Sequence, residues 1–446
     1  MFKELVNKFY GISAKISLGA IILIVIMGVY NLPGSTTIFR NRKFDTNKYT
    51  NQKQQKLAQT EDENTMIKLV YAYNKFGFKL FSEIRKSPSN ENIFISPISI
   101  AIALSMTYNG AAGKTQEAMA KILNFQGMNL EEINQANQDL GILLNSLNPE
   151  IKLNIANSIW TRKGISFYPS FLQVNQDFYQ SQVREIDFND PESPKIINNW
   201  VKDRTEGKID RIIQRKKLKP NSVILLLNAI YFKAAWQQPF SEYSTKEMPF
   251  YLANGTQKQH PIMFQESGYL YYENQDFQAV SLPYKKRRVS MYIFLPKPGV
   301  GLEKFHQVFN QKNWENWMKQ FEFENGTKRL SGNKVNLGLP KFKTKYEVTL
   351  NDVLKSLGME IAFNYKEADF SKMLPIPPNL YIDEVKHKTF VEVNEKGTEA
   401  AAVTRVEGST RSRPIEMLIN RPFFFAIRDN ESGIILFMGE ITNPET

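Results

Sequence analysis

Residues Glu395–Phe425 read EKGTEAAAVTRVEGSTRSRPIEMLINRPFFF, and this stretch decides how the rest of the chain is interpreted. From Thr398 to Gly408 every second residue is small or apolar, whereas charged residues such as Arg405 and Glu407 lie between them. This alternation is typical of a β-strand with one face that can pack. The alanines and flanking glycines give it weak strand propensity. We interpret it as a strand able to enter a sheet that is already packed, because it adds little side-chain volume.

The composition indicates a large globular chain. Its 446 residues are 42% hydrophobic and 12% aromatic, enough for one large domain or two ordinary ones. There is no cysteine, which excludes disulfides, thiol catalysis and cysteine-based metal sites. The formal charge is +12, with basic runs at Arg211–Lys219 and Lys285–Arg288. These runs fit either a polyanion site or a solvated helix end and a hairpin turn. No aromatic residues are interleaved with them, which argues against nucleic-acid binding.

The N-terminal segments differ from the rest of the chain. We expect a basic tail at 1–15, a membrane anchor or signal segment at 16–32, a polar tether at 33–64 and one folded domain at 65–446. The apolar run ISLGAIILIVIMGVY is short for a membrane span, but no convincing signal cleavage site follows it. Either alternative puts the main domain outside the cytoplasm, because the lysines of the tail favour an inside N-terminus.

Hydrophobic periodicity in the folded domain predicts an α+β fold with a large sheet. Ser96 and Pro97 occupy N-cap and first-turn positions of an apolar helix. The nearly unbroken apolar run SVILLLNAIYFKAAW at 222–236 predicts a central strand covered on both faces. The other expected helices lie at 65–81, 117–147, within 191–213, around 305–317 and at 346–357, and the other expected strands at 153–160, 181–188, 289–295, 335–342, 380–393 and within 423–441.

Catalytic and cofactor motifs are weak. Gly110–Thr115 resembles a phosphate-binding loop, but Tyr108 stands where that motif needs its first glycine. His260, His306 and His387 are scattered without ligand spacing, and no nucleophile elbow or zinc-protease motif occurs. We therefore expect neither an enzyme nor a metal or cofactor site.

Several long motifs, in order, give the chain a resemblance to the serpin family over residues 65–446. NIFISPISIAIALSM resembles the opening of the family's second helix, and NNWVKDRTEGKI resembles its N-x-W-V-x-x-x-T-x-G-K-I motif. NAIYFKAAWQQPF is similar to its central strand and turn, and VKHKTFVEVNEKGTEAA to the strand leading into its reactive loop. PKFK, ADFSKM, NRPFFF and FMGEITNP also match.

The resemblance implies a three-sheet α+β fold with about nine helices and an exposed reactive loop at 395–417. It also implies a mechanism in which a serine protease attacks the loop and becomes acylated. The cleaved loop then enters the main sheet and traps the acyl-enzyme, driven by a metastable native state.

Individual residues take their expected roles from the same resemblance. Family spacing gives Arg411–Ser412 as the scissile bond, and arginine there suits trypsin-like proteases with an acidic specificity pocket. Arg413 is a poor rival because it precedes Pro414, and a cut at Arg405 would leave a short inserted strand. The hinge residues matching the inhibitory pattern are Glu395, Gly397, Thr398, Glu399, Ala400, Ala401, Ala402 and Thr404.

Two further groups match family positions around the main sheet. Where the strands part, the match gives the shutter, a polar cluster of Ser96, Ser99, Asn228 and His387. Where the loop first enters, it gives the breach, formed by Trp236, Lys341 and Glu395, and we expect a Lys341–Glu395 ion pair there.

The function that follows is extracytoplasmic inhibition of a trypsin-like serine protease by a secreted or membrane-anchored monomer. The alternative is a non-inhibitory serpin scaffold that binds a ligand or client protein. Bulky or charged inward residues early in the hinge would favour that alternative, and Thr398, Ala400 and Ala402 are all small.

Overall fold

The computed structural model describes residues 46–87, 91–147, 150–214, 224–324, 327–328, 332–375, 379–398 and 413–446. The chain divides into two units, residues 1–57 and residues 58–446. The expected basic tail and the anchor or signal segment lie outside the described residues. Within the described ranges, no helix is both long and apolar enough to span a membrane.

Local sequence signals mark the starts of two helices, one of them the expected helix at Pro97. Ser96 caps the helix that begins at Pro97, since its side chain accepts a hydrogen bond from the Ser99 backbone N–H at 3.4 Å. Asn129 and Glu132 form a reciprocal capping box at another helix start. The α-helices of the described residues are α3 Thr46–Ile84, α4 Pro97–Tyr108, α5 Gly113–Leu123, α6 Leu130–Asn145, α7 Pro169–Tyr179, α8 Ser193–Arg204, α9 Gly301–Val308, α10 Gln311–Glu322 and α11 Asn351–Leu354.

A six-stranded sheet carries the hinge. Its order is β12-β13-β14-β4-β2-β3. The strands are β12 Phe342–Thr349, β13 Ile382–Asn394, β14 Gly397–Thr398, β4 Ile224–Ala235, β2 Ile151–Arg162 and β3 Gln182–Ile186. Only Lys233 of β4 is not fully buried, which confirms the central strand expected from its apolar run.

The remaining strands form the other sheets. The larger has the order β1-β17-β16-β8-β7-β6-β11-β15, with β5 also paired to β6, and β9 pairs with β10 in a separate hairpin. The long β6 joins two groups, because its residues 257–269 pair with β5 and β11 and its residues 270–273 pair with β7. The bounds are β1 Ile93–Ile95, β5 Thr245–Tyr251, β6 Gln257–Glu273, β7 Phe277–Pro283, β8 Val289–Pro296, β9 Phe323–Glu324, β10 Thr327–Lys328, β11 Asn333–Pro340, β15 Ile415–Leu418, β16 Phe423–Asp429 and β17 Ile435–Ile441.

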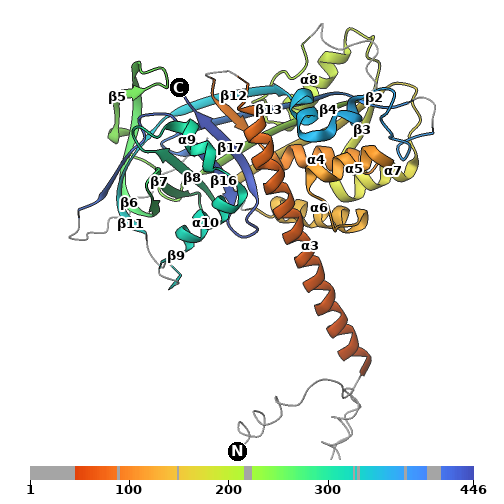
Figure 1. The fold of residues 1–446 in the computed structure, drawn as a ribbon, viewed down its shortest axis with the longest axis horizontal. Coiled ribbons are helices and arrows are strands. Elements are labelled where there is room, and N and C mark those ends of the chain that lie inside the picture. The colour runs from red at the N-terminus through yellow and green to blue at the C-terminus, as the bar shows by residue number, and fades with distance from the viewer. Residues whose placement is uncertain are drawn as a thin grey trace, which may run out of the picture. The chain divides into compact units, whose positions relative to one another are not determined.

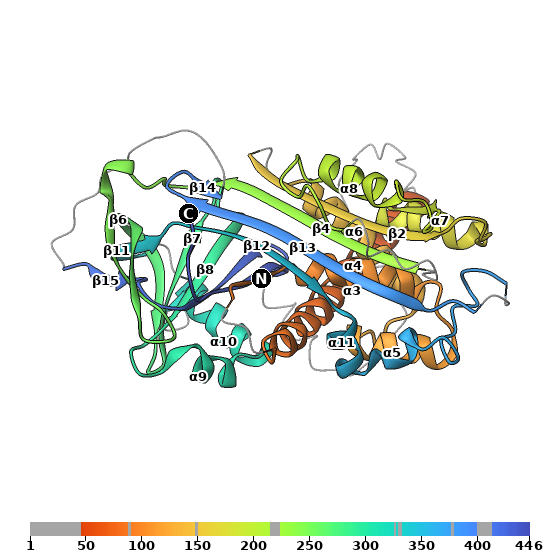
Figure 2. The same cartoon turned by 90° about the horizontal axis from the view of Figure 1, so that it is seen from above.

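The two faces of the six-stranded sheet are covered differently. Helices α4–α7 gather at the end away from β5–β8 (Figure 1). Figure 2 shows α8 lying over β4 and β2, with α4 on the opposite side. The α4 face belongs to the main hydrophobic core, whereas Ile197 and Val201 of α8 pack in a smaller cluster with Leu225, Leu227 and Phe390. A strand between β13 and β4 therefore meets apolar side chains on both faces along the part of the sheet that α8 covers.

Three sequence-based expectations were wrong in their boundaries. Helix α3 begins at Thr46, so the helix expected from residue 65 starts earlier, within the segment expected to be a polar tether. Residues 46–64 contain no glycine or proline and are rich in good helix formers. The expected helix at 117–147 is two helices, because Asn124 ends α5 in the left-handed region at φ 58°. Residues Tyr346–Thr349 belong to β12, where pairing with β13 overrides their helical periodicity.

Candidate functional site

The first hinge residues already form a short strand at the end of the six-stranded sheet. Gly397 and Thr398 pair antiparallel with Asn394 and Val393 of β13 on one side. On the other side they pair antiparallel with Ala235 and Ala234 of β4. The Thr398 side chain is fully buried, and its hydroxyl lies 2.8 Å from the Tyr284 hydroxyl. Thr398 therefore faces the core, as the alternation predicts.

Glycine is required at position 397 for steric reasons. Its φ is 145°, and a Cβ there would lie 2.3 Å from the Ala234 carbonyl oxygen. Only a residue without a side chain fits so close to the neighbouring strand. The hinge thus combines one obligatory glycine with a series of small residues.

Beyond Thr398 the sheet is closed. β13 and β4 pair directly and in parallel, from Ile382 opposite Ile224 to Phe390 opposite Tyr231. The described part of the hinge ends at Thr398, and β15 pairs in parallel with β11 of the other sheet. Arg411, Ser412, Glu399, Ala400, Ala401, Ala402 and Thr404 lie outside the described residues.

The structure brings together the three residues expected at the breach. Lys341 Nζ lies 3.1 Å from Glu395 Oε2, which is the expected ion pair. Trp236 Nε1 donates to the Asn394 carbonyl at 3.0 Å, and its ring stacks on Tyr284 with centroids 4.6 Å apart. These contacts fix the backbone at the start of the hinge.

The Glu395 carboxylate has a second polar partner besides Lys341. Burial alone would raise the pKa of Glu395, but hydrogen bonds from Thr245 and Lys341, together with the Lys341 charge, hold it below its usual value. The Thr245 hydroxyl donates to Glu395 Oε1 at 2.7 Å. The Glu395 carbonyl also accepts from the Phe240 N–H at 2.8 Å. The turn that follows β4 therefore anchors the base of the hinge.

The Tyr284 hydroxyl makes a testable contribution to hinge anchoring. Tyr284→Phe leaves the buried Thr398 hydroxyl without this partner, which should weaken β14 by about 1 kcal/mol. We expect amide hydrogen exchange at Gly397 and Thr398 to become about fivefold faster. Tyr292→Phe is the control, because its hydroxyl bonds Asn430 at the turn between β16 and β17. Equal exchange rates in both variants would contradict this contribution.

The four shutter residues form one buried hydrogen-bonded group beneath the sheet. The Ser96 backbone N–H donates to His387 Nε2 at 3.1 Å, and His387 Nδ1 bonds Asn228 Oδ1. Asn228 Nδ2 in turn bonds Ser99 Oγ. Because His387 and Asn228 are directly opposite in the β13–β4 ladder, this group fastens the two strands where they pair.

Sequence reasoning missed one member of the group, Asn157 of β2. Its Oδ1 accepts from Asn228 Nδ2 and, at 3.4 Å, from Ser99 Oγ. The antiparallel register puts Asn157 opposite Asn228. Asn157 is one of three polar residues in the strand segment LNIANSIW, so the sequence does not single it out, and only the β2–β4 register identifies its partner.

Burial makes His387 sensitive to acid. Because the Ser96 N–H occupies Nε2, the ring proton is on Nδ1 and is donated to Asn228. Burial lowers the pKa of His387 to about 3. Protonation at Nε2 would replace the acceptor of the Ser96 hydrogen bond with a second donor. The folded state therefore requires a neutral ring.

Stability should fall with acidification through the range set by this histidine. An unfolded histidine has a pKa near 6.5, so between about pH 6.5 and 3 the unfolded state binds more protons than the folded state. The free energy of unfolding should thus drop by up to roughly 1.4 kcal/mol per pH unit in that range. Urea midpoints at pH 7, 6 and 5 measure this effect. His387→Gln should have a shallower pH dependence, and an unchanged slope would exclude His387 as its source.

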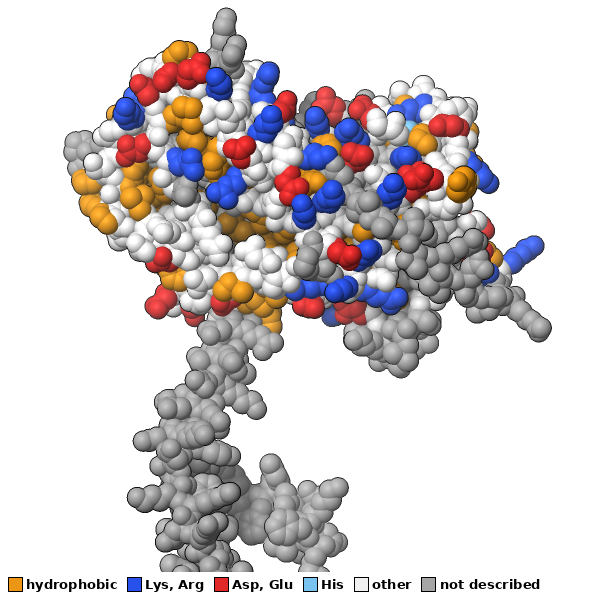
Figure 3. Space-filling model, turned by 180° about the vertical axis from the view of Figure 1, so that it is seen from behind, with side chains coloured by type: hydrophobic (Ala, Val, Ile, Leu, Met, Phe, Trp, Pro, Cys, Tyr) orange, Lys and Arg blue, Asp and Glu red, His pale blue; other side chains and the backbone are white. Residues whose placement is uncertain are grey.

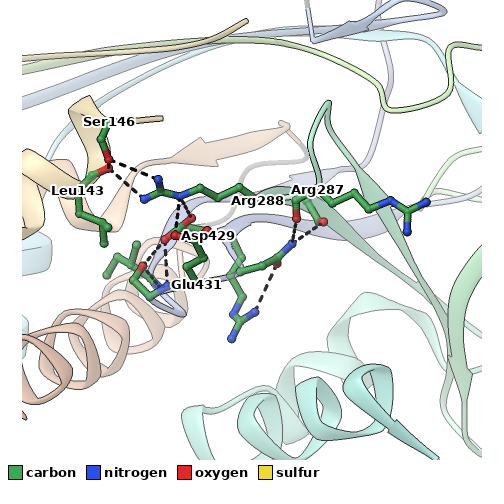
Figure 4. Close-up of polar contacts among 11 residues, drawn as sticks. Leu143, Ser146, Arg287, Arg288, Asp429 and Glu431 are labelled. Atoms are coloured by element: carbon green, nitrogen blue, oxygen red, sulfur yellow. Dashed lines mark hydrogen bonds and ion pairs between the residues drawn. The ribbon is translucent and has the colours of Figure 1, made fainter. Parts of the chain in front are cut away.

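Two of the four basic residues in the turn Lys285–Arg288 are paired with carboxylates. Arg288 Nε lies 3.1 Å from Asp429 and 3.3 Å from Glu431, and Arg288 Nη2 donates to the Leu143 carbonyl at the end of α6 (Figure 4). Lys285 pairs with Glu150 at 3.0 Å. Lys286 and Arg287 are exposed at the tip, both in the left-handed region. The turn therefore joins β7 and β8, and through Arg288 it also contacts the end of α6 and the turn between β16 and β17.

The histidines and acidic residues do not assemble into a metal site in the described part of the chain. There, no group of three or more metal-ligating side chains occurs. His260 bonds the Lys341 carbonyl, and His306 lies 2.9 Å from Glu440. The candidate functional site consists instead of the hinge strand β14, the neighbouring ends of β13 and β4, and small side chains.

Comparisons with known proteins agree with this architecture. Residues 71–444 match the family model described as serpin (serine protease inhibitor). The chain is 37% identical to an uncharacterized serpin-like protein of Thermococcus kodakarensis, over 84% of this chain and 86% of that protein. It is 34% identical to the human leukocyte elastase inhibitor, over 85% of this chain and all of that protein. Human thyroxine-binding globulin has a similar structure, with a TM-score of 0.76, 29% identity, and coverage of 86% of this chain and all of that protein.

Proposed function

The chain belongs to the serpin family, and on this premise we propose that it is a suicide-substrate inhibitor of trypsin-like serine proteases. Inhibition of proteases is the general activity of the family. The finer proposal is that a protease attacks the Arg411–Ser412 bond and is trapped as an acyl-enzyme when the loop enters the six-stranded sheet.

The observation that carries this proposal is the position of β14. Gly397 and Thr398 lie between β13 and β4, in antiparallel register with both. In the same register, Thr404 would reach Asn228 and His387, each six residues before the partners of Thr398. The inserted loop would thus replace the Asn228–His387 contact that now fastens the two strands. Its small residues at 400 and 402 would occupy the core-facing positions along the way.

The energetics favour insertion once the loop is cut. Insertion exchanges one parallel strand pairing for two antiparallel pairings, which are slightly more stable per residue. It first requires the β13–β4 ladder and the His387 group to open, and that requirement supplies a kinetic barrier. An intact loop is tied at both ends, since β14 and β15 belong to different sheets. Cleavage removes this constraint.

The outward position of Arg405 would lie under α8 rather than in water. In the same register, Arg405 would lie beside Leu227 and Lys386. Leu227 belongs to the cluster under α8, and Lys386 already pairs with Glu384 at 3.3 Å. We expect α8 to shift during insertion, and Glu384 to be available as a counter-charge for Arg405.

The experiment that tests the function is a reaction with trypsin. The purified chain is mixed with trypsin and analysed on a denaturing gel for a covalent complex of the two proteins. Clean cleavage at Arg411 without such a complex would contradict inhibition. That result would favour the alternative of a ligand-binding scaffold, for which the likeness to thyroxine-binding globulin is the support.

The location and the partners of the protein are also proposals. We propose that the inhibitor acts outside the cytoplasm as a secreted or membrane-anchored monomer, on the evidence of the apolar run at 16–30 and its lysine-bearing flank. A polyanion partner has little support from the turn Lys285–Arg288, and residues 215–219 of the other basic run, Arg211–Lys219, lie outside the described residues. Lys285 and Arg288 are paired with carboxylates, and basic and acidic side chains are interspersed over the face shown in Figure 3.

A further inference from the structure

A turn beside the hinge carries a fully exposed tyrosine. The short 3₁₀ helix η1 Glu242–Ser244 lies between β4 and β5. Tyr243 of this turn is 100% exposed, more than any other large apolar or aromatic side chain of the described residues, and the next, Tyr365, is 59% exposed. Single exposed apolar side chains are common on protein surfaces, so the position of Tyr243 decides what its exposure means.

The turn is fixed to the base of the hinge. Lys396 Nζ lies 3.5 Å from Glu242 Oε1, directly before Tyr243 in the chain. Directly after η1, the Thr245 hydroxyl donates to the Glu395 carboxylate at 2.7 Å. Contacts on both sides of Tyr243 therefore hold it beside the first residues of the reactive loop.

The other end of the reactive loop lies across the neighbouring sheet. The described chain resumes at Arg413, which is exposed and stands two residues before β15, as Tyr243 stands two residues before β5. Three strand spacings separate β15 from β5, through β11 and β6. The first residues of β15 and β5 are level with residues 267 and 263 of β6, which are four residues apart. Standard strand geometry then puts Tyr243 on the order of 20 Å from Arg413.

We propose that Tyr243 is an exosite, a contact outside the scissile bond, for the trypsin-like protease that attacks Arg411–Ser412. The inference rests on the proposed function. A protease domain of about 200 residues has a radius of roughly 20 Å, so a protease seated on the bond next to Arg413 extends over η1. Tyrosine offers a large apolar surface at a low cost in conformational entropy, which suits it to anchor such a contact. Its partner is an apolar patch beside the active-site cleft of the protease.

The test is the affinity of the full chain for trypsin in which alanine replaces the catalytic serine, because this protease docks without cleaving. We expect Tyr243→Ala to weaken the affinity about tenfold. Tyr243→Phe keeps the ring and should change the affinity by less than about twofold. Both variants should fold, since the side chain is fully exposed. With active trypsin, Tyr243→Ala should form as much covalent complex per cleaved molecule as the unmodified chain, because the contact acts before cleavage.

Tyr251→Ala is the matched control. Tyr251 is 47% exposed at the other end of β5, level with residue 257 of β6, which puts it roughly 40 Å from Arg413. This variant should bind inactive trypsin as the unmodified chain does.

The outcomes separate the exosite from the proposed function. Unchanged affinity in Tyr243→Ala, or equal weakening in both alanine variants, would overturn the exosite alone. A lower yield of covalent complex at unchanged affinity would also overturn it, because Tyr243 would then act on the hinge. No measurable binding of inactive trypsin by the unmodified chain would overturn the proposed function and the exosite with it.

Discussion

Thr398→Arg is expected to abolish the covalent protease complex while leaving cleavage of the loop intact. The Thr398 side chain is fully buried between β13 and β4, against Tyr284. An arginine there would bury an unpaired charge, which costs several kcal/mol. Insertion should therefore become slower than hydrolysis of the acyl-enzyme, and the protein should become a substrate. We expect at least a hundredfold decrease in complex per cleaved molecule, measured on denaturing gels.

Glu399→Arg is the matched control for this variant. It introduces the same side chain one residue later, on the opposite face of the inserting strand. In the β14 register, position 399 falls beside Lys233 and Glu392, both partly exposed. This variant should therefore still form the complex. An equal loss of covalent complex in both variants, or full inhibition by Thr398→Arg, would contradict the assignment of Thr398 to the core-facing side of the inserting strand.

Arg411→Ala is expected to slow inhibition of trypsin by at least about a thousandfold. A specificity pocket built around an acidic residue is left with an unpaired buried charge when the arginine is removed. The measurement is the second-order rate constant of inhibition. Mass spectrometry of the released C-terminal fragment complements it, and in the unmodified protein this fragment should begin at Ser412.

Arg413→Ala is the control for the scissile bond. Arg413 precedes Pro414, and the bond between them is a poor protease substrate. This variant should inhibit trypsin at an unchanged rate. The released C-terminal fragment should still begin at Ser412, and its mass should differ only by the replacement of arginine with alanine. A fragment that begins at another residue, or a slower rate of inhibition in this variant alone, would show that Arg411–Ser412 is not the scissile bond.

Much of the fold followed from local sequence signals. The apolar run of β4 and the cap formed by Ser96 and Pro97 were predicted correctly because burial on both faces and helix capping each leave a local pattern. Boundaries failed where a distant segment decided them. Tyr346–Thr349 has a helical period, yet it is a strand because β13 provides a complete ladder of partners.

In the candidate site, too, some contacts were predicted from the sequence and others were found only in the structure. The Lys341–Glu395 pair was expected from matched positions and is present. Thr245, Tyr284 and Asn157 were not expected, although each bonds directly to an expected residue. Their roles depend on which strands are neighbours, and no short motif records that.

The opening stretch shows what the sequence alone determined and what tertiary structure decided. Alternation from Thr398 to Gly408 predicts which side chains would face the core in an inserted strand, because successive residues of a strand point to opposite sides, and the one described member, Thr398, is buried. It could not determine that Gly397 and Thr398 already lie within the sheet. That depends on the space between β13 and β4, on the close approach of Gly397 to Ala234, and on the Tyr284 hydroxyl. A period of two residues is a local property, whereas the entry of a strand depends on a gap formed by segments far apart in the chain.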